Sequence, residues 1–296
     1  MVTGISEIES LGGDDVAGVE ALLARAARED GRPAVSEQGR LRLRRETAGV
    51  RHLLRRDEAA ELVGYAQVDG GTGELVVDPG ARRRGHGRAL LDAALQAGGE
   101  EFWAHGGHPG ARRLAEEHGL ALVRELRQMR RPLAGLADLP EPVFPEGVRV
   151  RTFVPGEDDA AWLALNAAAF AHHPEQGSWT EEDLKDRLAE PWFDPKGFFL
   201  AERAEDGRLI GFHWTKVHEE PGEPPIGEVY VVGVDPNAQG GGLGRALTAV
   251  GLRHLAGDRG LSAVLLYVDA DNTPAVRVYE RMGFTVHEVD LMYGRQ

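Results

Sequence analysis

Two glycine-rich stretches of the chain have the residue types that bind a phosphate. One reads Arg82-Arg-Arg-Gly-His-Gly87 and the other Gln239-Gly-Gly-Gly-Leu-Gly244. Each follows a run ending in Val-Asp-Pro and precedes an apolar pattern at helical spacing. Backbone N–H groups exposed at such a turn and at the N-terminus of the next helix attract phosphate or pyrophosphate. We therefore expect an anion-binding loop at each stretch.

Two common nucleotide-binding loops do not fit these stretches. A Walker loop has Lys and then Ser or Thr after its last glycine, where this chain has Arg245 or Arg88 followed by alanine. A dinucleotide-binding fingerprint needs a third glycine where Arg245 or Leu90 stands. Both classes are excluded.

The remaining pattern is Gln/Arg-x-x-Gly-x-Gly/Ala directly after a strand. It resembles the acetyl-CoA loop of the GCN5-related N-acetyltransferase (GNAT) superfamily. A second stretch, Asn272-Thr-Pro-Ala-Val-Arg-Val-Tyr-Glu-Arg-Met-Gly-Phe284, is similar to the family's Asn-x-x-Ala-x-x-x-Tyr-x-x-x-Gly-Phe helix. The resemblance implies an acyltransferase that uses acetyl-CoA as co-substrate.

Acetyl transfer to an amine needs a neutral nucleophile, a stabilised oxyanion and protonation of the leaving thiolate. Glu228 lies on the strand that leads into the second loop, and we expect it to be the general base, directly or through a water. Tyr279 lies on the following helix, where its hydroxyl can donate to the departing sulfur. The structural alternatives are a solvated strand carboxylate and a packed helix tyrosine.

Backbone N–H groups of residues 232–234 would meet the thioester carbonyl if the strand is splayed or bulged there, as Gly233 permits. The resemblance implies acetyl-CoA contacts in both glycine-rich regions. In the first region these are Leu75, Val76, Val77, Arg83, Arg84, Gly85, His86, Gly87 and Arg88. In the second they are Val232, Gly233, Val234, Gln239, Gly240, Gly241, Gly242, Leu243, Gly244, Arg245, Asn272, Thr273, Pro274, Ala275, Val276 and Arg277.

The two regions belong to an internal repeat. Asp78-Pro79 aligns with Asp235-Pro236, and without a gap Gly85 and Gly87 then fall on Gly242 and Gly244. We therefore expect a tandem α+β protein with two GNAT domains, each a mixed, mostly antiparallel sheet flanked by helices. The expected boundaries are 1–139, a proline-rich linker at 140–147, and 148–296.

The first copy lacks the acid and base. The offset that relates Asp78 to Asp235 places Gly71 at the position of Glu228. Farther along the first copy, Ala115 or Leu114 stands where Tyr279 would be. We expect the first copy to bind acetyl-CoA without catalysing transfer.

The whole chain resembles the mycothiol synthases of actinobacteria, a tandem family that acetylates the cysteinyl amine of a cysteine–glucosamine–inositol conjugate (desacetylmycothiol). The stretches that carry the resemblance are Val35-Ser-Glu-Gln38, Phe170-Ala-His-His-Pro-Glu-Gln-Gly177, His213-Trp-Thr-Lys216 and Gly227-Glu-Val-Tyr-Val-Val-Gly-Val-Asp-Pro236. The resemblance implies that the conjugate is bound by Glu37, Glu175, Lys216, Glu228 and Tyr267.

Each of these polar residues also has a structural interpretation: Glu37 as a helix cap, Glu175 in a solvated loop, and Lys216 on the surface. His172 and His173 lie beside Glu175, but no second ligand cluster at metal spacing accompanies them, so we expect no metal site. Two other functions stay open, namely an N-acetyltransferase for another amine, such as an aminoglycoside or a peptide N-terminus, and a non-enzymatic acetyl-CoA binder.

The elements that must position these residues follow from periodicity. Strands are predicted at residues 61–68 and 209–214, and helices precede them at 16–27 and 158–170. Helices should start at the glycines. The last predicted elements are a strand at 263–268, a helix at 274–282 with Gly283 as its C-cap, and a strand at 285–292.

Composition limits the remaining function classes. The 296 residues suit two domains, and the net charge of −14 argues against a nucleic-acid partner. Cysteine is absent, which excludes disulfides and a Cys nucleophile. No apolar run reaches the ~18 residues of a membrane span, and no signal peptide is evident. We expect a cytoplasmic monomer with a small-molecule amine substrate and no membrane partner.

Overall fold

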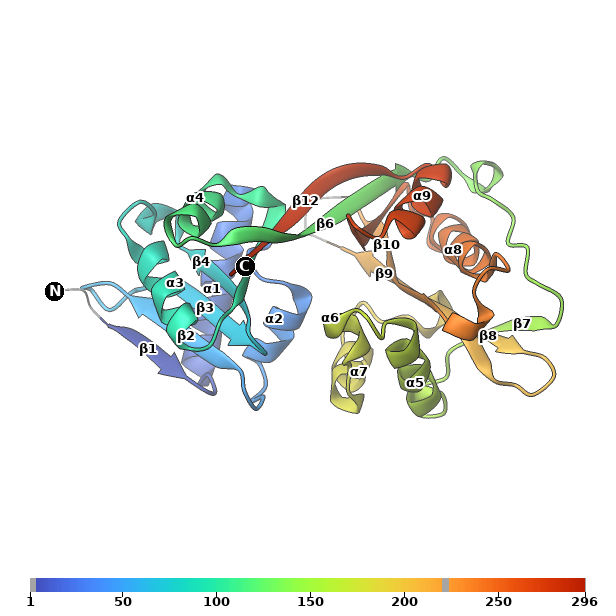
Figure 1. Cartoon of the computed structure of the whole chain (residues 1–296), viewed down its shortest axis with the longest axis horizontal. Helices are drawn as coiled ribbons and strands as arrows, with labels where there is room; N and C mark the ends of the chain where they lie inside the picture. The colour runs from blue at the N-terminus through green and yellow to red at the C-terminus, as the bar shows by residue number, and fades with distance from the viewer. Residues whose placement is uncertain (1–3, 220–223, 296) are drawn as a thin grey trace. The chain divides into compact units, whose positions relative to one another are not determined.

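The structure is a computed structural model that describes residues 4–219 and 224–295 (Figure 1). By contacts the chain forms two units. The first comprises Met1–Arg127, Asp269–Asp271 and Glu288–Gln296, and the second comprises Gln128–Val268 and Asn272–His287.

The first unit is a sheet with helices on both faces. Its helices are α1 (Gly13–Asp30), α2 (Glu37–Leu43), α3 (His86–Gln96) and α4 (Pro109–Glu117), with 3-10 turns η1 (Pro79–Ala81) and η2 (His105–Gly107). Its strands are β1 (Ile5–Ile8), β2 (Arg51–Arg56), β3 (Leu62–Asp69), β4 (Thr72–Val77) and β5 (Glu101–Ala104), joined by parts of β6 (Ala121–Pro132) and β12 (Thr285–Gly294).

Neighbouring strands from β1 to β4 pair antiparallel, β4 pairs parallel with β5, and β5 pairs antiparallel with the end of β12. One core lies between the sheet and helices α1 and α2, where Leu22 packs with Tyr65 and Val76. The other lies under α3 and α4, where Leu90 packs with Ala66. Both faces of the sheet are thus covered.

The second unit repeats this plan. Its helices are α5 (Asp159–Ala169), α6 (Pro174–Gly177), α7 (Glu181–Leu188), α8 (Leu243–Arg253) and α9 (Thr273–Arg281), with 3-10 turns η3 (Leu136–Asp138), η4 (Pro195–Gly197) and η5 (Pro236–Ala238) and a π-helical turn η6 (His254–Asp258). Its strands are β7 (Val148–Thr152), β8 (Phe198–Arg203), β9 (Leu209–His218), β10 (Ile226–Val234) and β11 (Ala263–Asp269), with parts of β6 and β12.

Strands β7 to β10 pair antiparallel in sequence order, and β10 pairs parallel with β11. Helices α5 to α7 cover one face over an aromatic core that contains Trp162, Phe198 and Trp214. Helices α8 and α9 cover the other face, with Leu252 and Val276 in its core. Figure 1 shows α5, α6 and α7 grouped together.

Strands β6 and β12 each contribute residues to both units. Residues 121–127 of β6 and 288–294 of β12 belong to the first unit, and the rest of each strand belongs to the second. The domain boundaries expected from the sequence, at residues 139 and 148, stay a prediction. Within the expected linker, Phe144 packs against the core that contains Leu243 and Leu247.

The predicted α+β class and the mixed, mostly antiparallel sheets are confirmed, as are the helices expected before each set of strands. The C-cap of α9 is Met282 and not Gly283 as expected. Gly283 is the next residue, and its φ of +85° is the left-handed conformation that commonly follows the cap. Among the described residues, no helix has the length and apolarity needed to cross a bilayer.

Candidate active site

Strands β10 and β11 separate in the middle of the second unit's sheet. Their parallel pairing covers Gly227, Glu228 and Val229, while β10 continues to Val234. The pairing with β11 therefore does not extend to residues 232–234, whose backbone faces the gap between the two strands. The splay expected at residues 232–234 is confirmed. The irregularity in the pairing with β9 lies earlier, between Val229 and Val231, which makes Tyr230 the bulged residue.

The loop after β10 has the shape expected of an anion cradle. Asp235 closes η5 by accepting a hydrogen bond from the Asn237 N–H at 2.8 Å. Gly240 and Gly242 then adopt φ of +92° and +81°, a region that favours glycine. Helix α8 begins directly after Gly242, so its first N–H groups are presented at the loop.

A pocket of about 410 Å³ lies between this loop and the splayed strand. Its lining contains many of the residues expected to hold acetyl-CoA. The full lining is Ala169, Phe170, Val232, Gly233, Val234, Ala238, Gln239, Gly240, Gly242, Leu243, Gly244, Arg245, Asn272 and Val278. At Gly233 a Cβ would lie 2.6 Å from the Phe212 ring and 3.1 Å from the Ala169 Cβ, so the pocket floor requires glycine there.

The other expected acetyl-CoA residues of this unit lie in the loop or on α9. Gly241 is in the loop, and Thr273, Pro274, Ala275 and Arg277 form the first turns of α9. Asn272 caps this helix by accepting from the Ala275 N–H at 3.2 Å. Val276 is buried in the core, which gives its side chain a packing role.

Glu228 lies on β10 directly opposite Lys216 of β9. Its side chain is buried, and its Oε2 lies 2.6 Å from Nε2 of His218. A buried carboxylate with a hydrogen-bond donor is held in one orientation. The structural alternative of a solvated strand carboxylate is wrong.

Tyr279 is partly buried on α9 and packs edge-to-face on Phe284 at 5.9 Å between ring centroids. Its neighbour Val278 lines the pocket. Burial raises the pKa of Tyr279 to about 12. The hydroxyl therefore stays protonated near neutral pH and is able to donate a proton.

Lys216 is buried among aromatic rings rather than placed on the surface. Its Nζ lies 4.4 Å from the centroid of the Trp192 ring and 5.1 Å from that of Tyr230. Tyr230 also accepts a hydrogen bond at 2.8 Å from Nε of Arg187. The cation–π contacts keep a positive charge within a largely apolar wall.

The remaining expected substrate residues are spread over both units. Tyr267 of β11 is exposed and accepts a hydrogen bond from Nε2 of Gln128 at 2.8 Å. Glu37 is the first residue of α2, where the cap is Ser36 and not Glu37. Glu175 lies on α6, and its side chain is outside the described part of the structure.

No group of three or more His, Cys, Asp or Glu in the described residues is arranged to hold a metal ion. His173 instead accepts a hydrogen bond from the Gln176 N–H at 3.3 Å and caps α6. Residues 19–120 and 162–284 match the sequence model of the acetyltransferase (GNAT) family.

The chain belongs to the GNAT acetyltransferase family. A protein of Streptomyces coelicolor named mycothiol acetyltransferase is 65% identical over 284 residues, which are 93% of this chain and 90% of that protein. One of Streptomyces avermitilis with the same name is 64% identical over 298 residues, 98% of this chain and 94% of that protein.

Two solved GNAT structures share the fold. A tandem GNAT protein from the clavulanic acid biosynthesis pathway has a TM-score of 0.73 at 21% identity and covers 99% of this chain and 98% of its own. A GCN5-related N-acetyltransferase from Sphaerobacter thermophilus has a TM-score of 0.67 at 26% identity, covering 98% and 95%. The tandem arrangement expected from the repeat is confirmed.

The first GNAT copy retains the loop conformation without all of its glycines. Arg83 and Gly85 have φ of +64° and +85°, as Gly240 and Gly242 do at the matching positions of the second copy. Strand β4 pairs with β5 only at Thr72 and Gly73, so this sheet is splayed too. The N-terminal loop thus keeps the shape of an anion cradle.

Several residues expected to bind acetyl-CoA in this copy have protein partners. Nδ1 of His86 accepts from Arg55 Nε at 3.2 Å, and Arg88 forms an ion pair with Glu117 at 2.5 Å. Val76 is buried in the core. Leu75 and Val77 pack against the core on the opposite face of the sheet. Gly85 is the N-cap of α3, Arg84 precedes it, and Gly87 is the second residue of the helix.

The first copy holds a buried carboxylate that sequence comparison did not predict. Glu74 of β4 accepts hydrogen bonds from the Ser36 N–H at 2.7 Å and the Ser36 hydroxyl at 3.0 Å. His105 Nε2 lies 2.8 Å from Oε1 of the same carboxylate, and His105 Nδ1 lies 3.2 Å from Asp290. Because these partners occupy both Glu74 oxygens, this carboxylate serves the fold.

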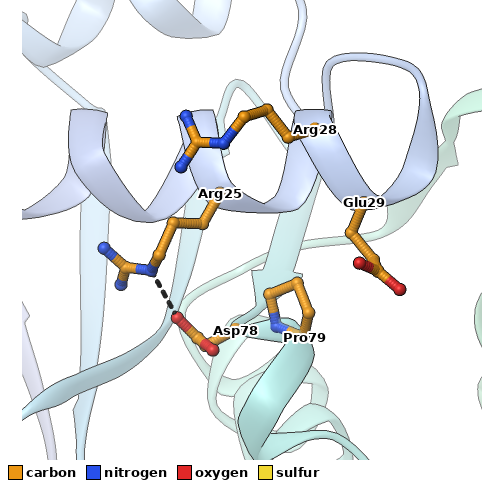
Figure 2. A pocket seen from close by; sticks show the side chains of 5 residues that line it. All are labelled: Arg25, Arg28, Glu29, Asp78 and Pro79. Carbon is orange, nitrogen blue, oxygen red and sulfur yellow. Dashed lines mark hydrogen bonds and ion pairs between the residues drawn. The ribbon is translucent and has the colours of Figure 1, made fainter.

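A second pocket, of about 280 Å³, lies at the turn after β4 and is lined by Arg25, Arg28, Glu29, Asp78 and Pro79. Figure 2 shows the Arg25 side chain directed at Asp78, and Arg25 Nε donates to Asp78 Oδ2 at 2.7 Å. Although burial opposes it, this contact holds the pKa of Asp78 below its usual range. The paired charges stabilise the turn.

Three residues that contact Glu228, Lys216 or Tyr230 were missed from the sequence, namely His218, Trp192 and Arg187. His218 could have been found, because it lies two residues after Lys216 on a strand and so shares its face. Trp192 and Arg187 come from the segment before β8. No local pattern predicts that these two side chains pack on Lys216 and Tyr230.

Proposed function

We propose that this chain transfers the acetyl group of acetyl-CoA to the cysteinyl amine of the cysteine–glucosamine–inositol conjugate, the last step of mycothiol biosynthesis. The observation that carries the proposal is the 64–65% identity, over most of the chain, to proteins named mycothiol acetyltransferase. The buried Glu228 and the protonated Tyr279 of the second copy support it.

The pocket residues fit a coenzyme with phosphates and a pantetheine arm. The loop from Gln239 to Arg245 supplies N–H groups for the pyrophosphate, and the free edge of residues 232–234 supplies backbone groups for the pantetheine amide. Acetyl-CoA brings the activated acetyl group as a thioester. The same edge offers an N–H to the thioester carbonyl, where negative charge develops during attack.

Proton transfers complete the reaction. Glu228 takes one proton from the substrate ammonium, and the neutral amine attacks the thioester carbon. As the C–N bond forms and the C–S bond breaks, the Tyr279 hydroxyl protonates the leaving thiolate. Tyr279 regains a proton from the former amine nitrogen, and Glu228 releases its proton to solvent. The products are the amide, CoA thiol and one proton.

In this proposal the first copy, residues 1–139, does not catalyse. Its only carboxylate on the matching face of β4, Glu74, is already occupied by Ser36 and His105. We propose that its cradle binds acetyl-CoA, that Glu37, Glu175, Lys216 and Tyr267 contact the conjugate, and that the chain is a cytoplasmic monomer.

The proposal is tested by incubating the protein with acetyl-CoA and a panel of amines and measuring the release of CoA thiol. The panel contains the cysteine–glucosamine–inositol conjugate, an aminoglycoside and a peptide with a free N-terminus. The expected result is a preference for the conjugate and a loss of about 10²-fold or more in kcat in Glu228→Gln. Preference for another amine would reassign the substrate, and no release with any amine would leave an acetyl-CoA binder.

A further inference from the structure

His218 is the last residue of β9 and contacts Glu228 across the sheet. In the β9–β10 register Lys216 pairs with Glu228 and His218 with Ile226. Side chains two residues apart on a strand share a face, so His218 and Glu228 are diagonal neighbours on one face. Diagonal pairs are within reach of long side chains, and Nε2 of His218 lies 2.6 Å from Oε2 of Glu228.

The two side chains differ in their access to solvent. The Glu228 side chain is 8% exposed and that of His218 is 31% exposed. Within residues 4–219 and 224–295, the hydrogen-bond partner of the Glu228 carboxylate is His218. A buried carboxylate needs such a donor, because an unpaired charge in a low dielectric is costly.

The contact also fixes which nitrogen carries hydrogen. An ionised carboxylate only accepts hydrogen bonds, so Nε2 must carry the hydrogen that it donates. This holds for the neutral imidazole with hydrogen on Nε2 and for the imidazolium alike. His218 therefore occupies Oε2 in either charge state and leaves Oε1 of Glu228 to accept a proton.

We propose that His218 is a positioning residue for acetyl transfer. Its Nε2–H holds Oε2 of Glu228, fixes the carboxylate rotamer and presents Oε1 to the acceptor ammonium. The inference rests on the proposed function, since it assigns Glu228 the role of base. His218 acts through Glu228 and is not itself the base.

Two amide variants separate this role from a general contribution to the fold. The Nε2 of glutamine reaches close to the place of histidine Nε2, whereas the Nδ2 of asparagine reaches only the place of Nδ1. His218→Gln can thus donate to Glu228, and His218→Asn cannot. His287→Asn, at an exposed position of β12, is the control for a change from His to Asn.

The kinetic test measures kcat and both KM values for the full-length variants with acetyl-CoA and the conjugate. We expect His218→Asn to lower kcat about tenfold, the equivalent of one hydrogen bond to a charged group. The KM for acetyl-CoA should stay within about twofold, and His218→Gln should keep most of the wild-type kcat. Equal losses in the Gln and Asn variants, or a wild-type kcat in both, would overturn the proposal.

A second readout is independent of activity. The imidazole ¹⁵N resonances of His218, assigned by their absence in His218→Gln, are compared between wild type and Glu228→Gln. A changed Nε2 resonance supports the contact, and an unchanged one overturns the proposal even in an active enzyme. If wild type releases no CoA thiol with any amine, the proposed function fails, while the resonance still reports whether His218 holds Glu228.

Discussion

Glu228 and Tyr279, which we propose as base and acid, lie on different elements of the second unit. Glu228 is a buried carboxylate held by His218, which suits the acceptance of a proton. Tyr279 keeps its proton because burial raises its pKa to about 12. The two environments suit the proposed roles of base for the carboxylate and acid for the phenol.

Tyr279→Phe removes only the hydroxyl. We expect kcat to fall about 10²-fold, because the thiolate then leaves without a proton donor, while the dissociation constant of acetyl-CoA stays unchanged. Steady-state kinetics by thiol release and calorimetric titration with acetyl-CoA measure the two quantities. If both change by the same factor, Tyr279 is a packing residue.

Gly233→Ala places a methyl group against buried neighbours. Phe212 is fully buried, and the Ala169 Cβ has no rotamer to adopt, so the core must shift. We expect a loss of about 1–3 kcal/mol in the free energy of unfolding and weaker acetyl-CoA binding, measured by urea denaturation and calorimetry. Gly13→Ala, with nothing within 4 Å of its Cβ, is the control. Unchanged stability and affinity would contradict the tight floor.

His105 joins three parts of the first unit. It follows β5 and contacts Glu74 of β4 and Asp290 of β12, and Glu74 in turn holds Ser36 at the start of α2. Although burial disfavours its charge, hydrogen bonds with Asp290 and Glu74 raise the pKa of His105 to about 10. The protonated histidine therefore ties the strands together.

The stability from His105 should depend on pH. Because the folded pKa lies above the ordinary value of ~6.5, the contribution is complete below ~6.5 and is lost as pH rises through about 10. His105→Gln should cost about 3 kcal/mol near neutral pH and remove this slope. Urea denaturation of wild type and variant from about pH 6 to about pH 9 measures the difference. A difference that is constant with pH would mean that His105 is neutral in the fold.

Local sequence patterns predicted most elements and the loop of the candidate site. Asp78-Pro79 and Asp235-Pro236 fix the turns, and the glycines mark the helix starts. The bulge at Tyr230 was not predictable, since it depends on the register between two strands. Nor was the role of Glu74, whose partners His105 and Asp290 are distant in sequence. Arg83 has a positive φ although Gly240 stands at the matching position of the second copy, so this turn conformation does not require glycine.

The two units defined by contacts do not coincide with the two copies of the sequence repeat. The repeat ends near residue 139, but the first unit also contains the end of β12, where Leu291 pairs with Ala104 and Tyr293 with Phe102. Tyr293 is part of the core under α3. Sequence periodicity predicted β12 but not the sheet in which it ends.

Cutting the chain at the repeat boundary tests this assignment. We expect residues 1–139 alone to aggregate or to lose cooperative unfolding, because the edge of β5 and part of the core are then exposed. The same segment with residues 285–295 appended should regain a cooperative transition. Circular dichroism melts and size-exclusion chromatography compare the two. Equal melting temperatures would show that the first copy folds without β12.

The extra residue at Tyr230 determines which way Glu228 faces. Val229 packs with the core under α8 and α9, and Val231 packs with the aromatic core on the opposite face. Strand β4 pairs with β3 without such an interruption. Since side chains alternate along a strand, removing Tyr230 would invert the phase of every earlier position and turn Glu228 toward the α8 side. A single inserted codon is therefore enough to decide toward which face of the sheet the carboxylate on this strand points.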